Sequence, residues 1–401
     1  MSTDLELMGQ ALALAGRARL RTPPNPWVGC VIVRDGEIVG EGSTQAPGGA
    51  HAEIEALRAA GDRARGATAY VTLEPCAHHG RTPPCTDALI AAGVTRVAVA
   101  LEDPDANVGG RGVAQLREHG ITVDVGIAAD LARLLLAPYL LHRRLGRSFC
   151  LLKTAMSVDA RIAAADGTSQ WITGPEARAD AHVVRSKSQA VVIGAGTALA
   201  DRPTLTARGI DPPVERQPLR VLLDARGRVP AVGPLFDTDL APTLVLTTAA
   251  APDDAANAWL AAGAKVLSLP AAASGHGVDL AATLETLGGL GVLQAMFEGG
   301  AQVAGALVES GLVDRLLLYV APMLLGTGAL AAFATDGPPT MPDAQLPFGH
   351  GAGSPFGHGA GRWQLIDVAR LGADVRLTYE PASGEPASGK TGSVPERESG
   401  A

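Results

Sequence analysis

Apolar residues recur at helical spacing near the start of the chain and then give way to β-rich runs. Residues 1–17 carry apolar side chains near a 3.6-residue period, which predicts an amphipathic helix. Residues 27–42 (WVGCVIVRDGEIVGEG) predict two strands, because the Asp35-Gly36 pair between them is typical of a tight hairpin turn. The chain therefore begins with a helix followed by a β-hairpin.

The pattern up to residue 145 continues as alternating helices and strands. Helical patterns cover 51–60, 86–92, 112–119 and a stretch ending near 145, and strand patterns cover 67–73, 96–101 and 121–127. Alternation of this kind places helices against a sheet. Residues 1–145 are therefore predicted to form one α/β domain.

A second alternating pattern follows residues 142–149 (HRRLGRSF), which contain few apolar side chains. Its strand patterns cover 150–156, 190–196, 219–225, 243–248, 264–269, 293–300 and 315–322, and its helical patterns cover 175–187, 278–288 and 301–310. We predict a second α/β domain over 146–380. Residues 381–401 are rich in Ser, Gly, Pro and charge and predict a disordered tail, and the repeated PFGHGAG (347–353 and 355–361) predicts a flexible loop.

Length, charge and cysteine content exclude several classes of protein. A chain of 401 residues is long enough for two domains. The net charge of -8 argues against a general nucleic-acid binder, although a few local arginines suffice to bind a small phosphorylated substrate. The sequence shows neither a signal-peptide pattern nor an apolar run of roughly 18 residues, and its four cysteines are too few for a disulfide scaffold. We expect a cytoplasmic protein that binds neither nucleic acid nor membrane.

Two short segments, HAEIEAL (51–57) and EPCAHHGRTPPC (74–85), carry candidate chemistry. His51, Cys76 and Cys85 provide one imidazole and two thiolates, and catalytic zinc takes three protein ligands of these types while keeping a position for water. Glu53 is a carboxylate able to carry a proton to a leaving group. Together they form the H-x-E…P-C arrangement of zinc-dependent base deaminases.

The spacing of these residues makes local predictions. Two positions apart in a helix are separated by roughly 200°, so His51 and Glu53 can share a site only at the first turn. Cys76, which follows Pro75, is predicted to begin a helix, where free N–H groups favour a thiolate. Eight residues separate Cys76 from Cys85, whereas common nucleobase deaminases have two.

Two interpretations without catalysis stay open from these residues alone. The cysteines could be buried free thiols with His51 as a helix cap. Alternatively, His78 or His79 could close a purely structural zinc site, although Glu53 would then have no purpose.

The motifs of both halves together resemble the family of bifunctional riboflavin-biosynthesis deaminase-reductases. The first half contains NPWVGCVIV, HAE and EPCAHHGRTPPC, and the second contains KTAMSVDARIA, SQWITGPEAR, IGAGTALADRPTLTAR and FEGGAQVAGALVESGLVDRL. The resemblance extends from about residue 5 to 375. It implies a cytidine-deaminase-like α/β/α sandwich followed by a dihydrofolate-reductase-like α/β domain.

This resemblance also implies two successive reactions. The first domain would use Zn²⁺ to deaminate 2,5-diamino-6-(5-phosphoribosylamino)pyrimidin-4(3H)-one to 5-amino-6-(5-phosphoribosylamino)uracil. The second would use NADPH to reduce the ribosyl group to a ribityl chain. Members of the family are commonly oligomeric, so a homo-oligomer is possible here.

Matching positions imply roles for individual residues. In the deaminase, Asn25 would hold the pyrimidine edge, and His78 and Arg81 would line the pocket, although Arg81 could equally be a solvated loop residue. The reductase residues implied to contact the dinucleotide are Ala155, Trp171, Thr197 and Asp201. Those implied to contact the substrate are Ser169, Arg185, Leu205, Arg208 and Glu298, with the arginines on its phosphate.

Three features of the second half can be interpreted from the residues themselves. Gly299 and Gly300 precede a helical pattern and predict a phosphate cradle, although a plain strand-to-helix turn would look the same. GAGTALA (194–200) lacks the third glycine of a dinucleotide-binding fingerprint. Lys153 is a lone charge in an apolar run, which favours substrate binding or catalysis over a snorkelling edge lysine.

One departure from the family and two rival functions complete the sequence-based expectations. The family usually has glycine where this chain has Ala160, in SVDA (157–160). If that position needs a positive φ, Ala160 would strain the edge of the cofactor site. The rivals are a nucleoside or tRNA base deaminase fused to an unrelated nucleotide-binding domain, and a non-catalytic zinc scaffold.

Overall fold

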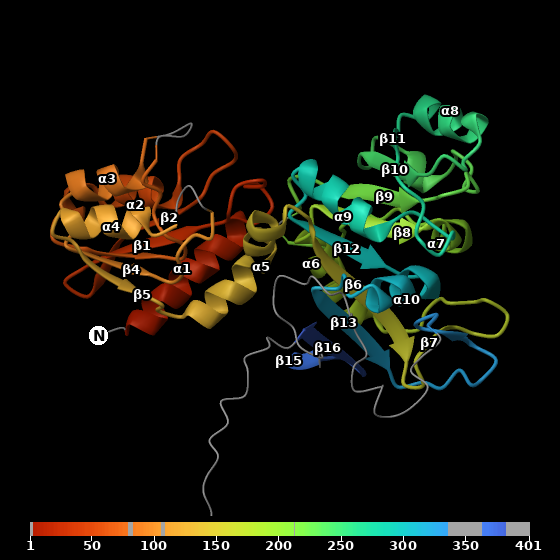
Figure 1. Cartoon of the computed structure of the whole chain (residues 1–401). Helices are drawn as coiled ribbons and strands as arrows, with labels where there is room; N and C mark the ends of the chain where they lie inside the picture. Colours follow the sequence, from red (N-terminus) through yellow and green to blue (C-terminus); the bar gives the residue numbers. More distant parts are fainter. Residues whose placement is uncertain (1–2, 79–82, 106–108, 212, 336–362, 382–401) are drawn as a thin grey trace, which may run out of the picture.

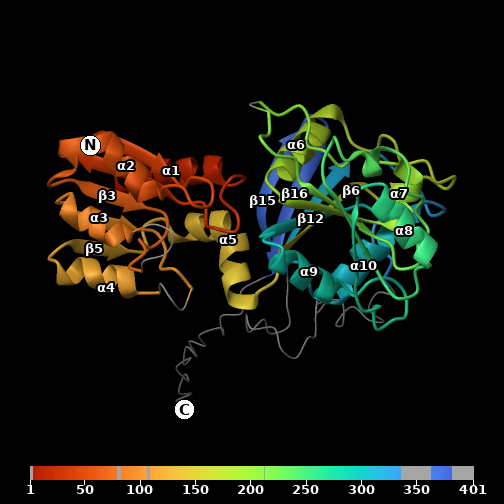
Figure 2. The same ribbon diagram turned by 90° about the horizontal axis from the view of Figure 1, so that it is seen from above.

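Two α/β domains lie side by side in the computed structural model, and helix α5 (Ala129–Leu145) stands between them (Figures 1 and 2). The structure describes residues 3–78, 83–105, 109–211, 213–335 and 363–381. None of the helices within these ranges has the length and apolar character that a bilayer crossing requires. The two-domain α/β class predicted from the sequence is confirmed.

The first domain is built on a five-stranded sheet with the order β2-β1-β3-β4-β5. Strand β1 is antiparallel to β2 and β3, and β3, β4 and β5 are parallel. The strands are β1 (Gly29–Arg34), β2 (Glu37–Ser43), β3 (Thr68–Val71), β4 (Arg96–Val99) and β5 (Thr122–Val125). The helices besides α5 are α1 (Asp4–Ala18), α2 (Ala52–Ala60), α3 (Cys85–Ala91), α4 (Arg111–Glu118) and the 3₁₀ turn η1 (Gly61–Ala64). Each helix and strand whose range was predicted for this half is present.

Helices cover both faces of this sheet because glycines on β1 and β2 allow close approach. A Cβ on Gly29 would lie 1.9 Å from the carbonyl oxygen of Ala11 in α1, and a Cβ on Gly42 would lie 2.2 Å from that of Ala52 in α2. Gly42 pairs with Cys30, and successive residues of a strand face opposite sides. Helices α1 and α2 therefore pack on opposite faces, which gives the predicted α/β/α sandwich.

The second domain is built on a nine-stranded sheet with the order β11-β10-β9-β8-β12-β6-β13-β16-β15. All neighbours from β11 to β13 are parallel, and β16 and β15 continue the sheet antiparallel. The strands are β6 (Phe149–Ser157), β8 (Ala190–Gly194), β9 (Leu219–Leu223), β10 (Thr243–Thr247), β11 (Lys265–Ser268), β12 (Gln294–Glu298), β13 (Arg315–Ala321), β15 (Trp363–Leu371) and β16 (Asp374–Pro381), and a separate small sheet pairs β7 (Arg161–Ala163) with β14 (Leu330–Ala331).

Helices α6 (Pro175–Ser186), α9 (Leu280–Gly289) and α10 (Ala301–Glu309) match the predicted ones. The sequence patterns did not predict α7 (Ala195–Asp201), α8 (Asp253–Ala261), the 3₁₀ turn η2 (Pro234–Phe236) or the β15–β16 hairpin. Helix α7 occupies the GAGTALA segment directly after β8, so that segment is a strand-to-helix junction.

The predicted domain boundary lies in the short connection between α5, which ends at Leu145, and β6, which begins at Phe149. The predicted division into 1–145 and 146–380 remains a prediction, although β16 extends one residue past it, to Pro381. The two PFGHGAG repeats and residues 382–401 lie outside the described residues.

Candidate active sites

The helix α2 begins where the zinc motif requires it to begin. His51 is its N-cap residue, with extended backbone dihedral angles, and Glu53 is its second residue. Both side chains therefore lie at the first turn, as their two-residue spacing predicted. Their shared position comes from the loop before α2, which delays the helix until residue 52.

The prediction that Cys76 begins a helix is wrong. Cys76 lies in the loop after β3, and Cys85 is the first residue of α3. Prolines 83 and 84 favour extended backbone in front of the helix, which delays its start. The thiol of Cys76 nevertheless meets the start of α3, because its Sγ accepts a hydrogen bond from the backbone N–H of Cys85 at 3.4 Å.

The three predicted metal ligands converge. Their ligand atoms all lie within 4.8 Å of one another, and no other such cluster occurs among the described residues. His51 Nδ1 is 3.2 Å from Cys85 Sγ and 3.6 Å from Cys76 Sγ. Tetrahedral zinc places nitrogen and sulfur ligands about 3.5 Å apart. The residues present therefore fit a zinc ion held by one imidazole and two thiolates.

The surroundings of the two cysteine ligands shift their pKa values in opposite directions. The Cys85 thiol and the His51 ring lower the pKa of Cys76 to about 4, whereas Cys76 and burial raise the pKa of Cys85. Glu53 is 3% exposed, and burial together with the neighbouring Cys76 raises its pKa to about 7. A buried carboxyl beside the ligand cluster is the group that a purely structural zinc site does not need.

Glu74 supports the Cys76 loop, and sequence reasoning gave it no role. It is 4% exposed, and its Oε2 accepts hydrogen bonds from the backbone N–H groups of Asp103 (3.2 Å) and Gly110 (3.0 Å), while its Oε1 accepts from Val113 (3.1 Å). The sequence did hold one signal for Glu74: it is a carboxylate that stands between an apolar strand and a predicted metal ligand. Glu74 thereby fixes the chain two residues before Cys76 against the start of α4.

We expect Glu74→Gln to lower zinc affinity by roughly 10- to 100-fold. The amide keeps one acceptor oxygen, but its NH₂ group then faces a backbone donor, so the loop that carries Cys76 shifts. Chelator competition measures the affinity, and the visible spectrum of the cobalt-substituted protein reports ligand geometry. Glu118→Gln, at an exposed position of α4, is the matched control. Unaltered affinity and spectrum in Glu74→Gln would refute this role.

Of the three other residues predicted for the deaminase site, the structure describes two, Asn25 and His78. Asn25 is half-buried in the loop between α1 and β1, where its N–H donates to the carbonyl of Thr22 at 2.8 Å. His78 is exposed at the end of the Cys76 loop. Arg81 lies outside the described residues. The ligand roles of these three residues remain predictions.

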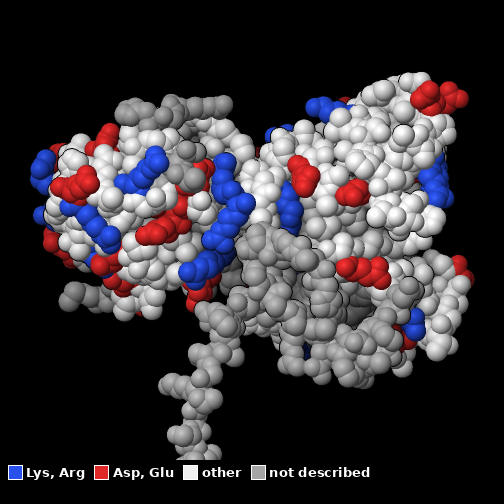
Figure 3. Space-filling model, viewed as in Figure 1, with Lys and Arg blue, Asp and Glu red and all other residues white. Residues whose placement is uncertain are grey.

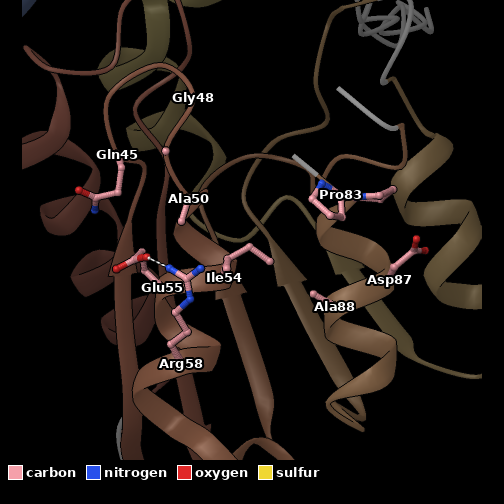
Figure 4. Close-up of a pocket in the computed structure, with 11 residues that line it drawn as sticks. Gln45, Gly48, Ala50, Ile54, Glu55, Arg58, Pro83, Asp87 and Ala88 are labelled. Atoms are coloured by element: carbon pink, nitrogen blue, oxygen red, sulfur yellow. Dashed lines mark hydrogen bonds and ion pairs between the residues drawn. The ribbon is translucent and has the colours of Figure 1, made fainter. Parts of the chain in front are cut away.

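A groove of about 860 Å³ lies beside the zinc ligands, between the outer side of α2 and the segment that leads into α3 (Figure 4). Ala50, Ile54, Pro83 and Ala88 are among the residues that line it, and the Glu55–Arg58 ion pair lies at its edge. The side chains of His51, Glu53, Cys76 and Cys85 do not line it. The groove is therefore lined by neighbours of the metal ligands and not by the ligands themselves.

The second candidate site is a charged cluster at the carboxyl end of strand β12 in the nine-stranded sheet. Glu298 ends β12 and pairs in register with Lys153 of the neighbouring β6. Arg185, in the last turn of α6, donates from Nε and Nη2 to the two oxygens of Glu298, both at 2.8 Å. The side chains of Arg185 and Glu298 are 13% and 12% exposed. The structure thus brings together three residues that the sequence placed far apart.

Burial and charge act in opposition within this cluster. Burial alone would raise the pKa of Glu298, but Arg185 and Lys153 outweigh it and lower that pKa to about 2. Burial lowers the pKa of Lys153, partly offset by Glu298. Two cations therefore share one carboxylate, which leaves positive charge to receive an anionic group.

The other residues with an implied substrate role lie partly around this cluster. Arg185 Nη1 also donates to the carbonyl of Thr206 at 2.7 Å, directly after the buried Leu205, whose φ is 55°. The guanidinium of Arg208 donates to Thr204 Oγ1, and its N–H to His182 Nδ1. Burial lowers the pKa of His182 to about 4, and sequence reasoning did not single this residue out.

The residues with an implied cofactor role are also partly assembled. Thr197 of α7 lies against the turn into α10, where a Cβ on Gly300 would be 2.9 Å from Thr197 Oγ1. Gly299 and Gly300 both have positive φ (70° and 73°), which is why this turn needs glycine. Asp201 accepts a hydrogen bond from Ser169 Oγ at 3.3 Å.

Two further residues with an implied cofactor role differ in exposure. Ala155 lies on β6, and Trp171 is 66% exposed beneath the guanidinium of Arg178, which lies 4.5 Å from the ring centroid. An exposed tryptophan of this kind has surface left for a ligand. The dinucleotide roles of all these residues remain predictions.

Ala160 does adopt a positive φ, of 57°. It follows Asp159, whose carboxylate accepts hydrogen bonds from Ser157 Oγ and the N–H groups of Leu325 and Gly326. These contacts fix the turn, so the alanine bears the cost of a left-handed conformation. The strain anticipated from the missing glycine is therefore present in the backbone.

We expect Ala160→Gly to raise the free energy of unfolding of the second domain by about 1 kcal/mol, because glycine adopts this φ without a Cβ penalty. The corresponding midpoint shift in a thermal melt is about 2–4 °C. Ala165→Gly, at an exposed position without positive φ, should instead lower the midpoint. A midpoint that falls in Ala160→Gly would show that the turn relaxes around alanine.

Comparisons with known proteins agree in both halves. The family model for the cytidine and deoxycytidylate deaminase zinc-binding region matches residues 1–101, and the model for the RibD C-terminal domain matches residues 148–347. The riboflavin biosynthesis protein RibD of Escherichia coli is 43% identical over 351 residues, covering 85% of this chain and 94% of that protein. RibD of Haemophilus influenzae is 38% identical over 390 residues, covering 95% and 98%.

Solved structures match over the same extent. RibD of Acinetobacter baumannii (form 1) has 39% identity and a TM-score of 0.80, covering 94% of this chain and 99% of that one. A diaminohydroxyphosphoribosylaminopyrimidine deaminase/5-amino-6-(5-phosphoribosylamino)uracil reductase from Thermotoga maritima has 29% identity and a TM-score of 0.77, with the same coverage. Both domains of this chain, and their order, are therefore those of the matched proteins.

Proposed function

Since this chain belongs to the RibD family of riboflavin-biosynthesis proteins, which join a deaminase to a reductase, we propose that it deaminates 2,5-diamino-6-(5-phosphoribosylamino)pyrimidin-4(3H)-one and then reduces the ribosyl group of the product with NADPH. The observation that carries the proposal is the convergence of His51, Cys76 and Cys85 beside the buried Glu53. A reductase domain follows on the same chain, so a product of the first site has a second site to enter.

In the deaminase half, His51, Cys76 and Cys85 would hold zinc. When bound, zinc supplies a nucleophilic oxygen at neutral pH by lowering the pKa of a water. Glu53, on the first turn of α2 beside these ligands, takes up a proton and delivers it to the departing amino group, which leaves as ammonia. Asn25 would hold the pyrimidine edge, and His78 would line the pocket.

In the reductase half, Lys153 and Glu298 would contact the substrate beside the reacting sugar, and Arg185 and Arg208 would receive the substrate phosphate. The bidentate contact of Arg185 with Glu298 and the register of Lys153 with Glu298 support a shared site. The glycine turn before α10 approaches the phosphates of NADPH, because free N–H groups at a helix start bind anions. Hydride transfer depends on orientation, which the residues of β6, α6 and β12 provide. Trp171 offers its exposed ring to the dinucleotide.

The proposal also covers the surface charge of the protein and its location in the cell. On the face in Figure 3 acidic and basic side chains are interspersed, which suits a small phosphorylated substrate better than a nucleic acid. This disfavours the rival of a tRNA deaminase. A cytoplasmic location, the absence of membrane partners and assembly into a homo-oligomer remain predictions.

A paired assay tests the proposal. Zinc-loaded protein receives the diamino substrate and NADPH, and ammonia release and NADPH oxidation are followed together. Both signals are expected, with NADPH oxidation lagging behind ammonia. Ammonia without NADPH oxidation would restrict the proposal to the first domain and direct attention to Ala160. No ammonia from this substrate, but ammonia from cytidine or adenosine, would favour the nucleoside-deaminase rival.

A further inference from the structure

Arg19 is a buried cation at the boundary between the two domains. It follows the last residue of α1 and is 8% exposed. Among the described residues no carboxylate forms an ion pair with it, and its Nε has no hydrogen-bond partner. Burial and the nearby Arg315 lower its pKa to about 9. A charge in such a place costs stability, so its presence needs another reason.

The contacts of Arg19 reach into both domains. Its guanidinium lies over the ring of Trp27 in the first domain, 4.9 Å from the centroid. Its Nη2 donates to Gln294 Oε1 in the second domain at 2.5 Å. Arg19 is thus held between a stacking contact on one side and a hydrogen bond on the other.

On the reductase side, Gln294 is fully engaged. It begins β12, and its Nε2 donates to Ser188 Oγ at 2.9 Å and to the carbonyl of Lys187 at 3.4 Å, while its backbone N–H donates to Gln189 Oε1. These partners form the turn between α6 and β8. The side-chain amide of Gln294 is therefore fixed in place, because it connects the start of β12 to the turn between α6 and β8.

On the deaminase side, Trp27 follows the loop that carries Asn25. The indole N–H of Trp27 donates to the carbonyl of Leu135 in α5 at 3.1 Å. Within the loop, the carbonyl of Pro24 accepts from Arg143 of α5 at 3.4 Å, and Pro24 also faces Gly291, in the turn between α9 and β12. The loop is thus pressed between α5 and the second domain.

We propose that Arg19 is a positioning residue that holds the Asn25 loop (residues 22–27) of the deaminase against the reductase domain, so that pyrimidine binding in the first domain depends on contact with the second. The inference rests on the proposed role of Asn25 in binding the pyrimidine. Arg19 itself does not touch substrate. It acts through Trp27, whose ring lies against its guanidinium in the first domain.

A positioning role and a stabilising role for Arg19 predict different effects of an apolar replacement. Replacing a buried ionic group by an apolar side chain of similar volume is often neutral or stabilising, because the desolvation cost disappears. If Arg19 served stability alone, Arg19→Met would be unfavourable for folding only. If it positions the loop, Arg19→Met should retain the fold and lose substrate affinity.

The test compares Arg19→Met with Arg17→Met, a matched control two residues earlier on an exposed part of α1. For Arg19→Met we expect the KM for deamination to rise roughly tenfold, kcat to change less than about twofold and zinc content to stay unaltered, since only the loop loses its support. The melting midpoint should be unchanged or higher. Arg17→Met should behave as wild type in all four measurements.

Gln294→Met provides the second arm, because it removes the same hydrogen bond from the other domain. It should raise the deaminase KM to a similar extent, and the double variant should be no worse than either single one. Hydrogen exchange at residues 20–28 should accelerate in Arg19→Met, a readout that does not depend on the substrate. An unaltered KM with unaltered exchange would overturn the inference, as would a lower midpoint with unaltered KM. A wild type that binds no pyrimidine would instead overturn the proposed function.

Discussion

Glu53→Gln is expected to reduce ammonia release by about 10³-fold, within the 10²- to 10⁴-fold range of general acid–base catalysis. The amide has nearly the volume of the carboxylate but can neither take up nor deliver a proton at neutral pH. Because Glu53 is 3% exposed and lies at the first turn of α2, bulk water is poorly placed to replace it. The ligands His51, Cys76 and Cys85 are untouched, so zinc content should stay at the wild-type level.

Two control measurements distinguish the loss of a catalytic proton carrier from general damage to the protein. The variant, supplied with the aminouracil product of the first reaction, should oxidise NADPH at the wild-type rate, because the reductase site is separate. Glu55→Gln, on the same helix but paired with Arg58 at its surface, should release ammonia normally. Wild-type ammonia release by Glu53→Gln would remove Glu53 from the mechanism.

The zinc site could be predicted from sequence because its ligands lie in short segments with strict local geometry. The two-residue spacing of His51 and Glu53 demanded a helix start, and α2 begins at residue 52. The position of Cys76 could not be predicted in the same way. Its relation to α3 is formed through space, by the N–H of Cys85, across eight intervening residues whose path local patterns do not determine.

Most strands of the two large sheets were predictable, and the clearest were buried strands such as β1 and β8, which are apolar in continuous runs. The hairpin of β15 and β16 was not, since its edge position leaves residues such as Leu365 and Val368 exposed and its pattern mixed. Helix α7 was missed for a different reason: it is only seven residues long, and its two neighbouring glycines, Gly194 and Gly196, resemble those of a phosphate-binding loop, which hides the helix preference of its alanines.

The residues that connect distant parts of the chain were the hardest to predict. Glu74 accepts hydrogen bonds from backbone N–H groups 29 to 39 residues later, and Arg19 meets Gln294 across the domain boundary. In sequence, each looks like an ordinary charged residue beside an apolar segment. Burial gives them significance, and burial depends on the tertiary fold.

Lys153→Met is expected to reduce NADPH oxidation with the aminouracil product by about 10²-fold or more, while ammonia release is retained. Lys153 pairs in register with Glu298, and methionine keeps the length of the side chain without its charge. Lys265→Met, on the exposed edge strand β11, is the matched control and should retain both activities. The aminouracil product should then accumulate in Lys153→Met, as mass spectrometry would detect.

The pH profile distinguishes a role in catalysis from one in packing. Burial lowers the pKa of Lys153, so its cationic form, present below that pKa, is lost at a lower pH than for an exposed lysine. Wild-type NADPH oxidation should therefore decline on the alkaline side, before the usual lysine range is reached, and Lys153→Met should lack this limb. A retained alkaline limb in the variant would assign the titration to another group.

Mixing Lys153→Met with Glu53→Gln extends the test to the path between the sites. One variant retains the deaminase and the other the reductase, so a freely diffusing intermediate lets the mixture form the ribityl product. Because each domain has its own sheet and core, damage in one should not disable the other. Failure of the mixture, with both single activities intact, would mean that the intermediate passes within one molecule, across the boundary where Arg19 meets Gln294.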